Sequence, residues 1–89
     1  MPSFRDMIVN AIETYNRYRS PLATAMLVEV REGLLTIDFE GTYCKSCGVY
    51  DYFEDFIYEL MAMADVQLEI LSYRTQGPES FRVKYAVKK

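Results

Sequence analysis

Hydrophobic residues recur at two different spacings along the chain, and the change of spacing divides the sequence into elements. Over residues 3–19 they recur every three or four positions, which is typical of one apolar face on a helix. Ser3 precedes this stripe as an N-cap, with Asp6 near the helix N-terminus, and Pro21 ends the pattern. The stripe consists of Phe4, Met7, Ile8, Ala11, Ile12, Tyr15 and Tyr18.

A β-hairpin follows the first helix, because the spacing becomes two from residue 25 onward. The alternation stops at Glu32-Gly33 and resumes at Leu35, which predicts two strands joined by a two-residue turn. In this register three pairs share one face and are expected to point inward: Val30 with Leu35, Val28 with Ile37, and Met26 with Phe39.

The second half of the chain repeats the change from helical to strand spacing. Residues 49–64 carry a second apolar helical stripe, in which Met61 is expected to fill the core, with acidic side chains in its first turns, where the helix dipole favours negative charge. Residues 66–71 predict a third strand, residues 75–78 a turn, and residues 81–88 a fourth strand. The inward positions of that last strand are Phe81, Val83, Tyr85 and Val87.

These elements predict a single α+β domain over residues 1–89, in the order helix-strand-strand-helix-strand-strand. Each helix has one apolar stripe and each strand one apolar face. We therefore expect two layers, a four-stranded, mainly antiparallel sheet with both helices on one face. The open face is expected to be polar, with four apolar residues that suit a dimer contact: Leu27, Leu34, Leu71 and Tyr73.

Composition narrows the function classes. The hydrophobic fraction of 51% and charged fraction of 26% are those of a folded protein, and no run reaches the ~18 apolar residues of a membrane span. The first residues lack the layout of a signal peptide, so we expect a cytoplasmic protein without membrane contact. Net charge is −3, acidic over residues 38–69 and basic beyond residue 72. The basic segment could attract an acidic protein partner, or could simply protect an edge strand.

The main chemical candidates are the two cysteines, Cys44 and Cys47, which lie between the second strand and the second helix. N–H groups at a helix start stabilise anions, which favours the thiolate form. The chain has no histidine, so it cannot supply a Ser-His-Asp triad or a histidine metal ligand.

Four interpretations of the pair remain open. It is half of a four-thiolate zinc or iron-sulfur site that a homodimer completes, or a thiol-disulfide redox pair. It is otherwise a structural disulfide in a small interaction protein of a hyperthermophile, or two thiols without a special role.

Residues 26–71 resemble the C-terminal domain of NifU-type iron-sulfur cluster scaffold proteins. The resemblance covers the hairpin over residues 28–40, Gly41, the C-x-x-C of Cys44 and Cys47, and the following helix and strand. It implies a transient cluster that Cys44 and Cys47 of two chains hold between them.

A shorter segment, residues 37–47, resembles the active-site segment of thioredoxins. It has Ile37-Asp38-Phe39 and an aromatic residue directly before the first cysteine of the C-x-x-C. This resemblance implies that Cys44 attacks a disulfide, Cys47 resolves the intermediate, and Asp38 is the nearby acid.

Other sequence signals favour a role that is not enzymatic. The glycines are isolated, so there is no phosphate-binding glycine-rich loop, and no carboxylate pair has catalytic spacing. The acidic net charge and the lack of an RNA-binding signature argue against a nucleic-acid partner. The sequence therefore favours a small cytoplasmic C-x-x-C protein, a scaffold or carrier of an iron-sulfur cluster or zinc, with the disulfide and redox alternatives open.

Overall fold

The fold begins with a helix that is capped as the sequence predicts. In the computed structural model, which describes residues 3–19, 23–41, 49–77 and 80–88, α1 spans Phe4–Arg19. The Ser3 hydroxyl accepts a hydrogen bond from the N–H of Asp6 at 3.1 Å, and the Asp6 carboxylate accepts one from the N–H of Ser3 at 3.3 Å. This reciprocal cap satisfies N–H groups at the helix start.

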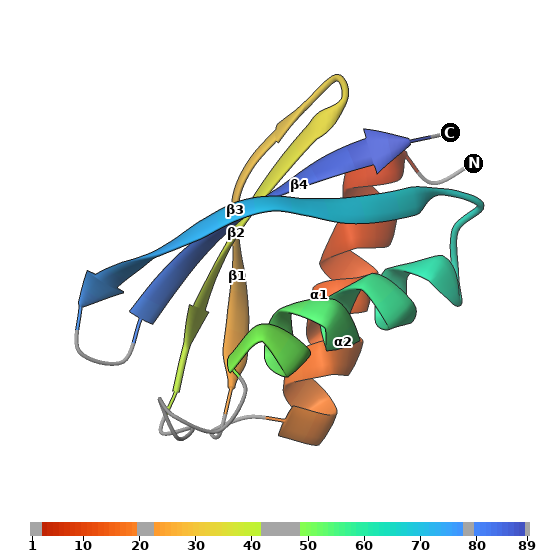
Figure 1. Ribbon diagram of the computed structural model, residues 1–89. Coiled ribbons are helices and arrows are strands. Elements are labelled where there is room, and N and C mark those ends of the chain that lie inside the picture. The colour runs from red at the N-terminus through yellow and green to blue at the C-terminus, as the bar shows by residue number, and fades with distance from the viewer. Residues whose placement is uncertain (1–2, 20–22, 42–48, 78–79, 89) are drawn as a thin grey trace.

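Four antiparallel strands form one sheet in the order β1-β2-β4-β3. Both helices lie against the same face of this sheet (Figure 1), which confirms the predicted two-layer α+β class. The chain runs twice through helix, strand, strand, and the second strands of the two hairpins, β2 and β4, pair at the centre. The remaining bounds are β1 Thr24–Arg31, β2 Leu34–Glu40, α2 Val49–Met61, β3 Gln67–Gly77 and β4 Ser80–Lys88.

The first hairpin has the predicted turn but a different register at its open end. Gly33 has φ +80, a conformation that glycine adopts readily, and Val30 pairs with Leu35. The register then shifts between Leu27 and Glu29, so Leu27 pairs with Ile37 and packs against the core. The prediction that Met26 and Val28 point inward is wrong, because this bulge reverses the alternation. Both are exposed, by 40% and 43%.

β3 is longer than predicted and contains a second register shift. It continues to Gly77, so the first positions of the predicted turn belong to the strand. The shift between Ile70 and Ser72 places Tyr73 opposite Val83, on the helix side of the sheet rather than on the open face. Tyr73 packs there against Phe53 and Phe81, with ring centroids 5.2 and 6.4 Å away.

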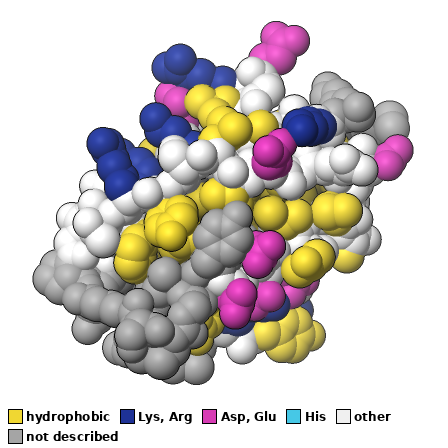
Figure 2. Space-filling view, viewed as in Figure 1, with side chains coloured by type: hydrophobic (Ala, Val, Ile, Leu, Met, Phe, Trp, Pro, Cys, Tyr) yellow, Lys and Arg dark blue, Asp and Glu magenta, His cyan; other side chains and the backbone are white. Residues whose placement is uncertain are grey.

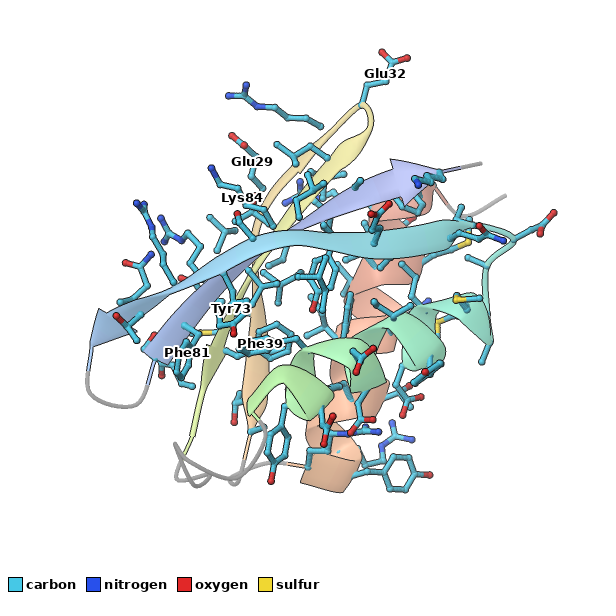
Figure 3. The ribbon with its side chains drawn as sticks, viewed as in Figure 1. Glu29, Glu32, Phe39, Tyr73, Phe81 and Lys84 are labelled. Atoms are coloured by element: carbon cyan, nitrogen blue, oxygen red, sulfur yellow. The ribbon has the colours of Figure 1, made fainter. Side chains whose placement is uncertain are left out.

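The core lies between the helices and one face of the sheet. Leu35, Ile37 and Phe39 of β2 are fully buried, as are Val83 and Tyr85 of β4. Figure 3 shows Phe39, Tyr73 and Phe81 on the helix side and Glu29 and Lys84 directed away from it. The predicted inward face of the fourth strand is therefore confirmed.

Asn16 fastens the first helix to the first strand. Its side-chain oxygen accepts a hydrogen bond from the N–H of Ala25 at 2.7 Å, and its side-chain nitrogen donates to the Ala25 carbonyl at 3.0 Å. This two-point contact fixes the start of β1 against α1. Ala25 is almost fully buried.

Two predicted core positions are at the surface, and the second helix is shorter than expected. Tyr18 is 73% exposed in the last turn of α1, and Met61 is 44% exposed at the last residue of α2. The chain leaves α2 through a turn in which the N–H groups of Met63 and Ala64 both donate to the carbonyl of Leu60. Predicted helical residues 62–64 therefore belong to the connection to β3.

Candidate metal centre

The candidate ligands Cys44 and Cys47 lie outside the described residues, in the connection between β2 and α2. The described chain reaches Gly41 on one side and resumes at Val49 on the other. β2 is a central strand, paired with β1 and β4 along its length. The motif thus joins a strand held on both sides to the first turn of a helix.

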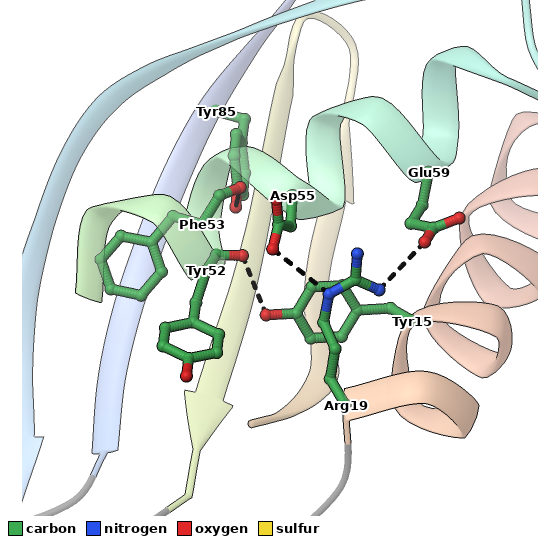
Figure 4. A network of polar contacts seen from close by, with 7 residues as sticks. All are labelled: Tyr15, Arg19, Tyr52, Phe53, Asp55, Glu59 and Tyr85. Carbon is green, nitrogen blue, oxygen red and sulfur yellow. Dashed lines mark hydrogen bonds and ion pairs between the residues drawn. The ribbon is translucent and has the colours of Figure 1, made fainter. Parts of the chain in front are cut away.

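Two buried tyrosines hold the first turns of α2 in place (Figure 4). The Tyr15 hydroxyl donates to the backbone carbonyl of Tyr52 at 2.8 Å, and the Tyr85 hydroxyl donates to that of Phe53 at 2.9 Å. Both tyrosine side chains are fully buried, and a buried hydroxyl needs a partner of this kind. One comes from α1 and the other from β4, so the helix start is fixed from two directions.

The sequence placed Tyr15 and Tyr85 among apolar positions and did not assign their hydroxyls a role. The one signal in the sequence is that these inward positions hold tyrosine rather than phenylalanine, because a buried tyrosine hydroxyl needs a polar partner. Their carbonyl partners are backbone atoms thirty or more positions away, which spacing alone does not reveal.

Arg19 connects the end of α1 to α2 (Figure 4). Its guanidinium lies 3.4 Å from Asp55 and 2.9 Å from Glu59, and 4.5 Å from the ring centroid of Tyr15. Burial alone would lower the pKa of Arg19, but the hydrogen bond to Glu59 and the charge of Asp55 together outweigh burial and raise it. This cation offsets part of the acidic charge of α2.

An aromatic cluster lies where β2 ends and α2 begins. Phe39, two residues before Gly41, has its ring centroid 5.2 Å from Phe53 and 5.5 Å from Tyr15. Phe53 in turn lies 5.6 Å from Phe81 of β4. Such edge and tilted contacts add to the burial of these large rings, so both ends of the cysteine connection start from closely packed positions.

Asp38, the acid in the thioredoxin comparison, lies on the open face of the sheet, where the alternation predicts it. Its two carboxylate oxygens accept hydrogen bonds from Arg82 at 2.8 and 3.0 Å. This two-point ion pair raises the pKa of Arg82, first through the hydrogen bond and then through the charge of Asp38.

Within the described residues, no three histidine, cysteine, aspartate or glutamate side chains are grouped as a metal site would require. None of the helices described is both long and apolar enough to span a bilayer. Comparison of the chain with protein families, curated proteins and solved structures gives no match.

Proposed function

We propose that this protein is a small cytoplasmic scaffold or carrier in which Cys44 and Cys47 of two chains together hold an iron-sulfur cluster or a zinc ion. The observation that carries the proposal is the position of the C-x-x-C between the end of β2 and the start of α2. Thiolates are the ligands that both zinc and iron-sulfur clusters accept.

The number of ligands argues for two chains. Zinc and iron-sulfur sites take four protein ligands in their common form, and the chain has two cysteines and no histidine. A two-fold homodimer supplies each cysteine twice and closes the site at its axis. The cluster or metal is then cargo shared between the copies, and the role is binding and transfer rather than catalysis.

The fixed ends of the connection support this role. Tyr15 and Tyr85 anchor the start of α2, and neighbouring strands pair with β2 on both sides. Ligands between two rigid elements lose less conformational freedom when a metal binds. The positive end of the helix dipole lies at the start of α2 and favours the negative charge of thiolates.

The test is anaerobic purification followed by iron, sulfide and zinc analysis, visible absorbance, and a thiol count on the native protein. We expect about half a metal centre per chain, lost in Cys44→Ser and in Cys47→Ser. Ser46→Ala is the matched control, because it changes the same connection without removing a thiol, and it should bind as the wild type does.

Two other outcomes would contradict the proposal. Metal-free protein whose native state shows no reactive thiols would indicate a structural disulfide between Cys44 and Cys47. Metal-free protein that reduces disulfides, with this activity lost in Cys44→Ser, would indicate a redox pair.

A further inference from the structure

A basic hollow lies on the open face of the sheet, where β3 and β4 pair. It has a volume of about 150 Å³, and its lining residues are Ser72, Arg74, Arg82 and Lys84 together with Tyr73, whose ring lies on the helix side of the sheet. Three of these residues are basic and none is acidic. Figure 2 shows Lys and Arg side chains gathered toward the upper left of the molecule, where this face looks outward. The hollow is on the side of the sheet away from α2.

Two arginines face each other directly across this hollow. Arg74 of β3 is the cross-strand partner of Arg82 of β4, and Ser72 is the partner of Lys84. Like charges directly opposite each other destabilise a sheet. A sequence that keeps two arginines at paired positions therefore loses stability there unless an anion offsets their charge.

The carboxylate of Asp38 neutralises only one of these cations, Arg82. Asp38 occupies the guanidinium of Arg82 with both carboxylate oxygens. Within the described part of the chain, the side chains of Arg74 and Lys84 have no hydrogen bond or ion pair, as is also true of Arg5 and Arg17 on α1. The hollow therefore has two cationic side chains available for a ligand.

Two irregularities in β3 bracket the lining residues. The register shifts between Ile70 and Ser72 and again between Thr75 and Gly77. Bulges bend a strand, increase its twist and redirect side chains, and they are frequent beside functional sites. The short regular stretch between them carries Ser72 and Arg74.

We propose that Ser72, Arg74 and Lys84, beside the Arg82 that Asp38 holds in place, form a binding site for a phosphate group, either free phosphate or the phosphate of a small monoester. An arginine fork and a lysine ammonium are the usual phosphate ligands, and the Ser72 hydroxyl adds a donor. The volume of the hollow is well above the ~15 Å³ that a cavity needs to hold one water, so a tetrahedral phosphate group has room to enter it. This site is separate from the cysteine pair and does not depend on it.

The experiment is a titration of ¹⁵N-labelled protein with inorganic phosphate at constant ionic strength, followed by amide chemical shifts. We expect saturable shifts concentrated at residues 72–75 and 82–84. Arg74→Gln and Lys84→Gln should each weaken binding roughly tenfold, the effect of losing one charge-assisted hydrogen bond. Lys88→Gln is the matched control on the same strand, since Lys88 pairs with Glu69 outside the hollow, and should change binding less than about twofold.

A melting measurement separates loss of the site from loss of the fold. In phosphate-free buffer, Arg74→Gln should melt no lower than the wild type, because it removes the like-charge pair. At the same phosphate concentration, the melting temperature should rise more for the wild type than for Arg74→Gln, because the variant binds phosphate more weakly.

Parallel titrations with ribose 5-phosphate and with a single-stranded oligonucleotide distinguish the ligand sources. Tighter binding of the monoester identifies it as the ligand form, and equal binding identifies free phosphate. Shifts that chloride reproduces, that do not saturate, or that occur in Arg74→Gln with the affinity of the wild type overturn the proposal. Oligonucleotide binding far tighter than either phosphate ligand also overturns it in favour of a nucleic-acid surface.

Discussion

Single hydroxyl groups hold the helix on which the proposed metal centre depends. Tyr15 and Tyr85 are both fully buried, and each donates to a backbone carbonyl in the first turns of α2. Replacing either tyrosine by phenylalanine keeps the ring and its packing but removes one buried hydrogen bond. Water does not reach this position to replace the bond, so the folded state loses stability.

We expect Tyr85→Phe to lower the free energy of unfolding by about 1–2 kcal/mol. The control is Tyr58→Phe, because Tyr58 of α2 is 65% exposed and its hydroxyl should contribute less than about 0.5 kcal/mol. Urea unfolding followed by circular dichroism measures both. Equal, small effects would mean that the Tyr85 hydroxyl does not stabilise the start of α2.

A second effect at the residue scale depends on pH. The hydrogen bond from Lys88, together with its charge, lowers the pKa of Glu69 from the ordinary value of 4.5. A carboxyl whose pKa is lower in the folded state contributes stability above its unfolded pKa and loses that contribution as the pH falls through the folded pKa.

Glu69→Gln should therefore be slightly less stable than the wild type at pH 7, and the difference should vanish as the pH falls below 4.5. Glu69 is exposed, so the effect is small and should weaken further in high salt. Urea unfolding over a pH series tests this, with the exposed Glu13→Gln as the control. A difference that persists at low pH would show that the side chain acts through packing instead.

At the scale of elements, the sequence predicts where periodicity is clear and fails where it is ambiguous. The fourth strand alternates apolar and polar residues strictly, and its inward face is correct. Met26, Leu27 and Val28 are all apolar, so either face suits them and periodicity cannot locate a bulge. The same holds around Leu71, where a second bulge turns Tyr73 toward the helices.

The candidate site was predictable only in part, for a similar reason. The C-x-x-C and its place between strand and helix follow from the sequence. The hydrogen bonds that fix α2 depend on tertiary contacts between distant residues. The basic stripe beyond residue 72 was visible, but the pairing of Arg74 with Arg82 depends on a register that the bulge changes.

The bulge in β1 predicts that Leu27, and not its neighbour Met26, contributes to the core. Leu27→Ala should cost about 2 kcal/mol, because Leu27 packs against the core. Met26→Ala should cost ~0.5 kcal/mol, because Met26 is on the open face. Strict alternation predicts the opposite order, so a larger loss for Met26→Ala in urea unfolding would contradict the bulge.

The two proposed sites, the cysteine pair and the phosphate hollow, differ in the charge of their surroundings and in the layer of the fold on which they lie. In the helix layer, α2 carries four acidic residues and no basic one, and Arg19 of α1 partly offsets this charge. The open face of β3 and β4 carries the basic hollow. The cysteine connection joins a central strand to the helix layer, so a metal at one end and a phosphate on the open face need not exclude each other.

Oligomeric state is the property on which the proposed function depends most directly. If two chains share the centre, the metal favours the dimer and the dimer favours the metal, because binding and association are linked. We expect the metal-loaded protein to elute as a dimer and to dissociate when a chelator removes the metal. Its melting temperature should rise with protein concentration, and the chelated protein's should not.

Light scattering during chromatography, before and after chelation, measures this linkage. Cys44→Ser should behave like the chelated wild type, and Ser46→Ala should remain a metal-dependent dimer. A metal-loaded monomer would exclude a centre shared between chains, because one chain supplies two cysteines and no histidine. A dimer that persists in Cys44→Ser and after chelation would show that the chains associate through another surface, and the shared centre would then have to be tested by its metal content per dimer.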